Sequence, residues 1–333
     1  MAVDTKKIGQ LIVAGFDGNT PPDYILELIE NDNLGGIILF TRNGRSPSDF
    51  RNLIINLSPN SQLRPLVFID QEGGRVNRIN FGRQMPSAWE LASWSDDERF
   101  DQENYLTAHE LKDIGVHVNT VPVVDIPSRD DVPVLEGRCY GRTPEAVIRY
   151  SGRVINIYNE IGVLSCAKHY PGLGDVAIDP HLDLPVDTTD MPRLTSFKLL
   201  PFIEAIRNGV PIIMTTHVIL EALDRQPVTF SKKAVHEILV GRCNFKGMIV
   251  TDDLEMGAVS KHFKWEETII NALNAGHHQL LICHEKDKQL NAMDIIAREV
   301  EENDNFAKTV EIAIEKVIEF KQRYFSRIGH IAT

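Results

Sequence analysis

Hydrophobic residues along the chain gather in eight short runs, most of which are continuous rather than alternating with polar residues. Continuous apolar runs of this length are typical of parallel strands whose two faces are both covered. We therefore expect a parallel sheet with helices packed on it. The predicted strands are 11–16, 35–40, 66–71, 116–125, 162–169, 211–217, 247–253 and 278–283.

Helix-like stretches fill the seven gaps between these strands, and a longer one follows the last strand. Eight strand–helix units in 333 residues predict an α/β fold of the (β/α)₈ TIM-barrel type, with residues 1–333 as a single domain. A doubly wound open sheet is the rival, but residues 14–20 lack the glycine spacing of its phosphate-binding turn. The predicted helices are 23–30, 48–57, 103–114, 144–160, 194–207, 232–240, 265–275 and 288–325, the last with a break near 301–305.

Composition and charge narrow the possible partners. A net charge of -12 argues against nucleic acid or an anionic membrane as the main partner, because phosphate binding needs clustered Lys and Arg. No apolar run approaches the length that crosses a bilayer, and the run at 11–16 is too short for a signal-peptide core. The four cysteines lie far apart, which favours reduced thiols over a zinc site or disulfides. A cytoplasmic protein is expected.

Ionisable residues gather where the predicted strands end, whereas the strand starts carry mostly Gly, Pro and apolar residues. In a barrel of this type, binding and catalytic sites form at the carboxyl ends of the strands. The asymmetry therefore predicts a polar, catalytic pocket at that face. The residues at the strand ends are Asp70, Asp125, Lys168, His169, His217, Asp252 and Asp253, with Arg75 and Arg78 just beyond the third strand.

Several of these residues have a structural alternative. Asp125 could simply form a turn at the end of its strand, and His217 could be a buried imidazole whose hydrogen bonds are satisfied within the barrel. Side chains alternate across a strand, so Asp252 and Asp253 cannot both face the pocket. One of the two should face the pocket, and the other is expected to cap the helix-like segment 254–259. The alternation does not say which.

One stretch carries the densest chemistry, Lys-His-Tyr-Pro-Gly-Leu-Gly-Asp-Val-Ala-Ile-Asp-Pro-His at 168–181. Three further motifs occur in order with it: Asp-Gln-Glu-Gly-Gly-Arg-Val at 70–76, Gly-Arg-Cys-Tyr-Gly at 137–141 and Thr-Asp-Asp-Leu-Glu-Met at 251–256. Together they resemble glycoside hydrolase family 3, in particular its small, single-barrel β-N-acetylglucosaminidases. The likeness extends over nearly the whole chain, from 35–40 to 275–283.

The resemblance implies a retaining hydrolysis of terminal β-linked N-acetylglucosamine (GlcNAc) from cell-wall fragments or chitin oligosaccharides. It selects Asp252, directly after Thr251, as the catalytic nucleophile. It also gives the acid/base role to His181, with Asp179 to orient and charge the imidazole. No metal, organic cofactor or protein partner is implied. The residues expected to hold the sugar are Asp70, Arg78, Arg138, Lys168 and His169.

Three positions depart from the family pattern. Leu173 replaces a histidine in the Pro-Gly-x-Gly motif, Pro180 stands where serine is usual, and His278 stands where an acidic residue is frequent. We expect these changes to tune the choice of leaving group and the motion of the loop. The alternatives are a β-glucosidase or a GlcNAc phosphorylase on the same fold, or a sugar-binding protein that has lost turnover.

Overall fold

Eight parallel strands close into a barrel in this computed structural model, which describes residues 3–57, 63–79, 82–127, 132–174, 176 and 178–329. Each strand pairs with its neighbours in the order β1-β12-β11-β9-β7-β6-β3-β2, and β2 pairs with β1 to complete the circuit. The predicted TIM barrel is confirmed. Its strands are β1 (Ile12–Ala14), β2 (Gly36–Leu39), β3 (Leu66–Ile69), β6 (Val118–Asn119), β7 (Leu164–Tyr170), β9 (Ile212–Thr215), β11 (Met248–Asp253) and β12 (Gln279–Ile282).

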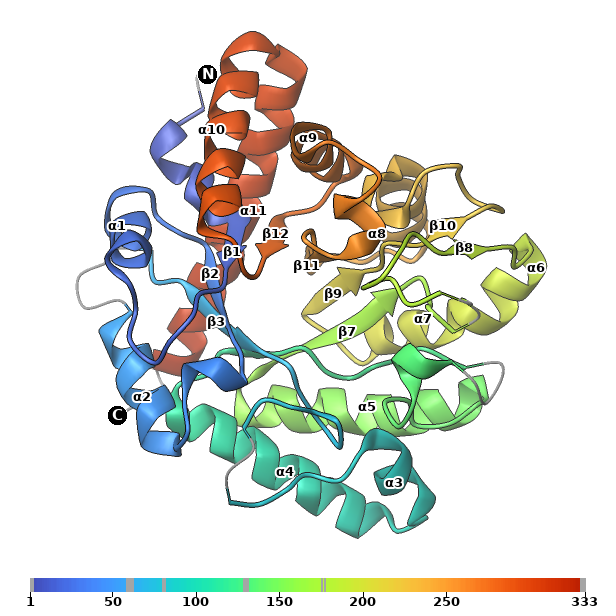
Figure 1. The fold of residues 1–333 in the computed structure, drawn as a ribbon. Coiled ribbons are helices and arrows are strands. Elements are labelled where there is room, and N and C mark those ends of the chain that lie inside the picture. The colour runs from blue at the N-terminus through green and yellow to red at the C-terminus, as the bar shows by residue number, and fades with distance from the viewer. Residues whose placement is uncertain are drawn as a thin grey trace.

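Helices surround the barrel, with α10 and α11 side by side next to the N-terminal segment (Figure 1). The α-helices are α1 (Asp23–Asn31), α2 (Pro47–Asn56), α3 (Ala88–Ser93), α4 (Asp97–Ile114), α5 (Pro144–Ile161), α6 (Met191–Arg193), α7 (Leu200–Arg207), α8 (Gly257–Ser260), α9 (Trp265–Ala275), α10 (Lys286–Glu302) and α11 (Asp304–Gly329). Short 3₁₀ turns lie at η1 (Thr5–Leu11), η2 (Thr41–Asn43), η3 (Pro133–Leu135) and η5 (Val228–Phe230), and π-helical segments at η4 (Leu194–Lys198) and η6 (Lys233–Arg242).

The barrel interior is a packed apolar core. Every strand contributes at least one buried side chain to it, so the barrel is filled rather than hollow. Larger apolar clusters lie between the strands and the surrounding helices, which explains why the strands read as continuous hydrophobic runs. The cluster includes, with one side chain from each strand, Val13, Ile38, Phe68, Val118, Cys166, Met214, Val250 and Leu281.

All eight predicted strands are present, and the fourth is the most changed. The prediction extended it over 116–125, whereas β6 covers only Val118–Asn119. Pro122 follows, and because proline has no amide hydrogen it cannot continue the ladder. Beyond β6 the chain still follows β7, through a bridge between Val123 and Lys168 and a hydrogen bond from the amide of Val124 to the carbonyl of Lys168 at 2.8 Å, which brings Asp125 to the barrel mouth.

The helices match with several differences, among them the short helix α6 and the π-helical geometry of η4, which were not predicted. Helix α3 was not predicted, and α4 begins at Asp97, six residues before the expected start, because Asp96 caps it through the amide of Arg99. The stretch predicted at 232–240 has π-helical geometry in η6. The expected break near 301–305 lies at Asn303, whose side chain accepts from two amides of the first turn of α11.

Two small additional sheets lie at the carboxyl ends of the barrel strands. The hairpin of β4 (Gln71–Gly73) and β5 (Val76–Asn77) follows β3, and β8 (Val186–Asp187) pairs with β10 (Ile219–Leu220). In the part of the chain that the structure describes, no helix is both long and apolar enough to span a bilayer.

Candidate active site

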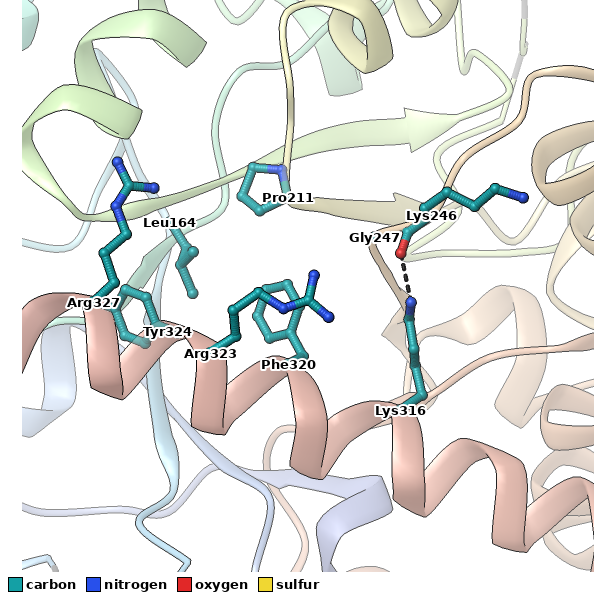
Figure 2. Close-up of a pocket in the computed structure, with 9 residues that line it drawn as sticks. All are labelled: Leu164, Pro211, Lys246, Gly247, Lys316, Phe320, Arg323, Tyr324 and Arg327. Carbon is teal, nitrogen blue, oxygen red and sulfur yellow. Dashed lines mark hydrogen bonds between the residues drawn. The ribbon is translucent and has the colours of Figure 1, made fainter.

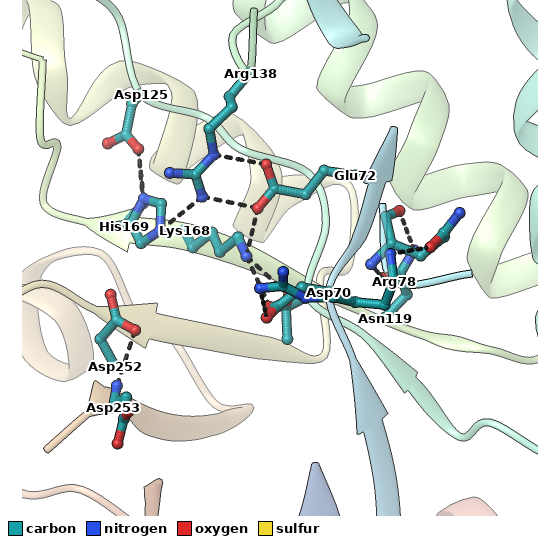
Figure 3. A network of polar contacts seen from close by, with 12 residues as sticks. Asp70, Glu72, Arg78, Asn119, Asp125, Arg138, Lys168, His169, Asp252 and Asp253 are labelled. Carbon is teal, nitrogen blue, oxygen red and sulfur yellow. Dashed lines mark hydrogen bonds and ion pairs between the residues drawn. The ribbon is translucent and has the colours of Figure 1, made fainter. Parts of the chain in front are cut away.

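The ends of β3, β7 and β11 bring most of the sequence-predicted polar residues to one end of the barrel (Figure 3). Asp70 directly follows β3, Lys168 and His169 lie near the end of β7, and Asp252 lies near the end of β11. The clustering expected from the strand ends is therefore present. Arg138 reaches the same region from the segment before α5.

Lys168 is the centre of this network. Its buried ammonium lies 3.1 Å from Oδ1 of Asp70, 2.7 Å from Oε1 of Glu72 and 2.9 Å from the hydroxyl of Thr120. Burial alone would lower the pKa of Lys168, but the two carboxylates outweigh it and raise the pKa above its usual value. Lys168 is therefore a fixed cation.

Glu72 is the site residue that the sequence reasoning missed. Arg138 donates to both of its oxygens, from Nε at 2.7 Å and from Nη2 at 2.8 Å, in the bidentate geometry that favours carboxylates. Burial raises the pKa of Glu72, but Arg138 and Lys168 outweigh it and bring the pKa down to about 2. The only available signal was its position inside the glycine-bent motif at 70–76.

The backbone around Glu72 explains its placement. The side chain of Asn119 holds the peptide of Gln71, accepting from its amide and donating to its carbonyl, both at 2.9 Å. Gly73 and Gly74 then turn the chain with φ values of 88° and 54°, a region that glycine adopts without strain. The glycine-bent loop predicted from the motif is thus observed.

Asp70 is held by Lys168 and by Arg78, whose Nη2 lies 3.1 Å from Oδ2, and it also accepts from Thr120. Burial raises its pKa, but these cations and hydrogen bonds outweigh that effect, so the pKa of Asp70 lies well below its usual range. Asp70 is therefore an ionised acceptor. The guanidinium of Arg78 also lies over the ring of Phe40, 5.2 Å from its centroid.

Asp125 belongs to the network and is more than a turn former. Its fully buried carboxylate accepts from Nδ1 of His169 at 2.7 Å and from the amide of Leu173 at 2.6 Å. It thereby links the imidazole to the loop after β7. On its other side, Nε2 of His169 lies 3.5 Å from Nη2 of Arg138.

The side chains of Asp252 and Asp253 have different neighbours, as expected because successive side chains of a strand point to opposite faces. Burial raises the pKa of Asp252, but His169, His217, His181 and the amide of Asp253 together outweigh it and lower the pKa. Asp253 instead accepts from the amides of Glu255 at 3.1 Å and Cys283 at 3.3 Å. The expected helix cap is therefore wrong in detail: Asp253 caps the turn after β11 and ties it to β12, while α8 starts after Met256 without a side-chain cap.

His181 and Asp179 form a hydrogen-bonded pair. Oδ1 of Asp179 accepts from both Nδ1 and the amide of His181, at 2.8 and 2.9 Å. A carboxylate can only accept, so Nδ1 carries the hydrogen and Nε2 stays available. The imidazole is 61% exposed, yet close enough to Asp252 for its charge to lower the pKa of that carboxyl.

The loop that carries this pair is fastened to the segment after β11. The amide of Gly257 donates to the carbonyl of His181 at 3.2 Å, and the amide of Ala258 donates to that of Pro180 at 2.9 Å. A Cβ at position 257 would lie 2.7 Å from the carbonyl oxygens of His181 and Leu182, so glycine permits this close approach.

His217 fits its structural alternative, although it lies close to Asp252. It is fully buried, with Nε2 2.9 Å from the carbonyl of Asp253 and Nδ1 2.6 Å from the hydroxyl of Thr229. A carbonyl only accepts, so Nε2 donates, and burial lowers the pKa of His217 in favour of the neutral ring. Both ring nitrogens are therefore engaged.

Within the described ranges, no group of three or more His, Cys, Asp or Glu side chains is arranged to hold a metal ion.

The sequence matches the family description "Glycosyl hydrolase family 3 N terminal domain" over residues 3–320. The chain belongs to glycoside hydrolase family 3.

Similar proteins in this family carry related names. A protein named beta-hexosaminidase from Methylococcus capsulatus is 35% identical over 256 residues, which is 75% of this chain and 75% of the relative. Another beta-hexosaminidase, from Alkalilimnicola ehrlichii, is 31% identical over 82% of this chain and 80% of its own length. A solved family 3 beta-N-acetylglucosaminidase from Paenibacillus sp. superposes with a TM-score of 0.92 at 33% identity, covering 97% of this chain but only 63% of that one.

The three departures from the usual family 3 motifs fall in different places. Leu173 is buried in a small apolar cluster with Val123, Leu135 and Val218, beside Asp125. Pro180 lies in the loop that carries His181, and its carbonyl accepts a hydrogen bond from the amide of Ala258. His278 lies just before the start of β12, far from the carboxyl ends of the strands. Its Nδ1 accepts from the amide of Ile249, and burial lowers its pKa to about 3.

Proposed function

We propose that this family 3 protein, as one catalytic domain over residues 1–333, is a retaining exo-β-N-acetylglucosaminidase that removes terminal β-linked GlcNAc. The observation that carries the proposal is the exposed His181–Asp179 pair beside the ionised carboxylate of Asp252. The names of the relatives support the sugar. An imidazole acid/base distinguishes this site from glycosidases that use two carboxylic acids.

In the first step, an oxygen of ionised Asp252 attacks the anomeric carbon while protonated His181 gives the Nε2 proton to the glycosidic oxygen. The bond between that oxygen and the anomeric carbon breaks, the alcohol leaves, and the sugar stays bound to Asp252 as an ester. The lowered pKa of Asp252 keeps the attacking group ionised, and the Asp179 carboxylate orients the imidazole through its Nδ1.

In the second step, neutral His181 removes a proton from water, and the oxygen of that water attacks the anomeric carbon. The ester bond breaks, free GlcNAc is released, and Asp252 returns to its ionised form. His181 is protonated again, so the cycle closes. The exposure of the imidazole leaves room for both the leaving group and the water.

The charged network would hold the sugar. Asp70 offers acceptor oxygens, while Arg78, Arg138 and Lys168 offer N–H donors fixed by ion pairs, and His169 is oriented by Asp125. Sugar hydroxyls donate and accept at once, so alternating fixed charges suit them. All four cysteines are free thiols, and we place the enzyme in the cytoplasm, acting on cell-wall fragments or chitin oligosaccharides.

The test is hydrolysis of an aryl β-N-acetylglucosaminide, with the aryl β-glucoside as the competing substrate. Asp252→Asn should lower kcat by roughly 10³-fold or more, and His181→Ala by roughly 10²–10⁴-fold. Asp253→Asn is the matched control, because it changes the adjacent carboxylate that points elsewhere. Full activity in Asp252→Asn would refute the nucleophile, and preference for the glucoside would refute the sugar.

A phosphate arm of the same assay separates hydrolysis from phosphorolysis. An imidazole acid/base would not repel phosphate as a carboxylate would, so this alternative has a structural reason. The proposal expects free GlcNAc as the product with or without phosphate. Formation of GlcNAc 1-phosphate would replace hydrolysis by phosphorolysis.

A further inference from the structure

A cavity lined by the residues drawn in Figure 2 lies at the strand starts, at the end of the barrel opposite the candidate active site. Its volume is about 320 Å³, and it is bounded by the starts of three strands and one face of α11. Leu164 begins β7, Pro211 directly precedes β9 and Gly247 directly precedes β11. The polar network described above lies at the other ends of β7 and β11.

Helix α11 supplies one continuous face of this cavity. Its residues there are spaced by four, three, one and three positions, which places them on the same side of an α-helix. Cationic side chains alternate with aromatic ones along this face, as Figure 2 shows. The residues are Lys316, Phe320, Arg323, Tyr324 and Arg327.

Three cationic side chains of α11 line the cavity, and the Lys246 side chain leads away from its rim (Figure 2), although the chain as a whole carries a net charge of -12. Lys316 Nζ donates to the carbonyl of Lys246 at 2.5 Å, and Arg327 donates to the carbonyl of Asn159 at 3.0 Å. In the part of the chain that the structure describes, none of Lys246, Lys316, Arg323 and Arg327 forms an ion pair with a carboxylate. Their positive charges are therefore not neutralised by the protein.

Lys316 is repelled by the neighbouring positive charges. Burial lowers its pKa, and the neighbouring cations Arg323 and Lys246 lower it further, while Glu319 on the same helix opposes them only in part. An anion between these cations would remove this repulsion. One amine hydrogen bond to a carbonyl also leaves two further N–H donors on Lys316.

The rest of the cavity is apolar. Leu164, Pro211 and the ring of Phe320 form its floor, together with the ring of Tyr324. The hydroxyl of Tyr324 is already engaged, because it donates to the carbonyl of Gly162 at 3.1 Å. A ligand that fits would therefore have an anionic group near the cations and a small ring or other apolar body against the floor. A volume near the lower limit for ligand pockets selects a small molecule.

We propose that this cavity is a binding site for a small organic phosphate, with its phosphate held by Arg323 and Lys316 and its body against Phe320 and Tyr324. A phosphate monoester carries up to two negative charges, which matches several unneutralised cations better than a single carboxylate does. The planar guanidinium of Arg323 can bind two phosphate oxygens at once.

The test is calorimetric titration of the full chain with phenyl phosphate, with inorganic phosphate and benzyl alcohol as the two partial ligands. Saturable binding of phenyl phosphate, tighter than that of either partial ligand, is expected. Arg323→Gln should weaken it about tenfold, because it removes a charge-assisted bidentate contact. Arg323 is exposed, so its substitution leaves the fold intact.

Lys308→Gln is the matched control, because it removes one exposed positive charge from the same helix outside the cavity. It should leave the affinity unchanged. Binding that does not saturate, an equal loss in both variants, or full affinity in Arg323→Gln would each overturn the proposal. The readout needs no catalytic turnover, so it does not depend on the proposed hydrolysis.

Discussion

His169 donates a hydrogen bond from Nδ1 to Oδ2 of Asp125 across 2.7 Å, and its own backbone amide reaches the same oxygen at 3.2 Å. Because the carboxylate only accepts, this contact fixes which ring nitrogen carries the hydrogen. Nε2 is then turned towards Arg138 and the site. We therefore expect Asp125 to be a positioning residue, which acts on a ligand through His169.

Replacing that carboxylate should affect substrate binding. Asp125→Asn removes a charge-assisted hydrogen bond, and kcat/KM for the aryl β-N-acetylglucosaminide should fall about 10- to 100-fold. The loss should appear mainly in KM, because His169 is expected to hold the sugar rather than react. Steady-state kinetics beside a thermal unfolding curve measure both effects. Unchanged KM in a folded variant would contradict the role.

Glu72 should be important for stability as well as for the site. Glu72→Gln leaves Arg138 and Lys168 without their shared buried counter-charge, and the free energy of unfolding should fall by roughly 3–5 kcal/mol. Glu266→Gln is the matched control, since it breaks an exposed ion pair with Arg298 and should cost less than about 1 kcal/mol. Urea unfolding of both variants compares the two, and equal losses would contradict the prediction.

The same carboxyl gives an acid-side prediction. The folded-state pKa of Glu72 is about 2, below its ordinary 4.5, so the folded state binds fewer protons than the unfolded state between these values. Its contribution to stability is present above pH 4.5 and is lost as the pH falls through about 2. Unfolding measured over this range should therefore be less pH-dependent in Glu72→Gln than in the wild type. Parallel curves would refute the assignment.

Asp179 should affect activity with little effect on the fold. Asp179→Asn removes the carboxylate that accepts from Nδ1 of His181 and orients its ring, and kcat should fall about tenfold or more while the unfolding curve stays in place. The control is Asp183→Asn in the same loop, whose partner is His262 instead. A similar fall in both variants would show that the loop conformation, not the pair, is responsible.

The buried amine of Lys321 should make the free energy of unfolding depend on pH above neutrality. Its amine is buried, donates to Oε1 of Gln10 at 2.9 Å, and has a pKa lowered by burial to about 7. The unfolded state then binds more protons than the folded one between about pH 7 and 10.5, so this group makes stability rise with pH in that window. Urea unfolding at pH 7 and 9 should show a smaller rise, or a larger fall, in Lys321→Met than in the wild type. An identical pH dependence would contradict the prediction.

The barrel could be predicted from the sequence because strands covered on both faces must be continuously apolar. That signal identified every strand, although most predicted runs are longer than the observed strands, above all at β6, where Pro122 interrupts the ladder. The end of α10 was also predictable, since Asn303 is a good capping residue. The π-helical geometry of η6 was not, because it depends on packing rather than on local preference.

The candidate site was predictable where one motif carries both partners. Asp179 and His181 are two residues apart, and their hydrogen bond is local. Glu72 was missed because its partner Arg138 is 66 residues away, and only the closed barrel brings them together. The basic cavity was missed for the same reason, since Lys246 and Lys316 are 70 residues apart.

The contact between Gly257 and the carbonyl of His181 has a consequence for protein engineering. The segment that follows the strand of Asp252 is hydrogen-bonded to the loop that carries His181, so we expect that the two cannot be exchanged between homologues as independent modules. A grafted loop would need its matching partner segment, including a residue without a side chain at position 257. Chimeras that exchange both segments together should retain the spacing of Asp252 and His181, whereas single grafts should lose it.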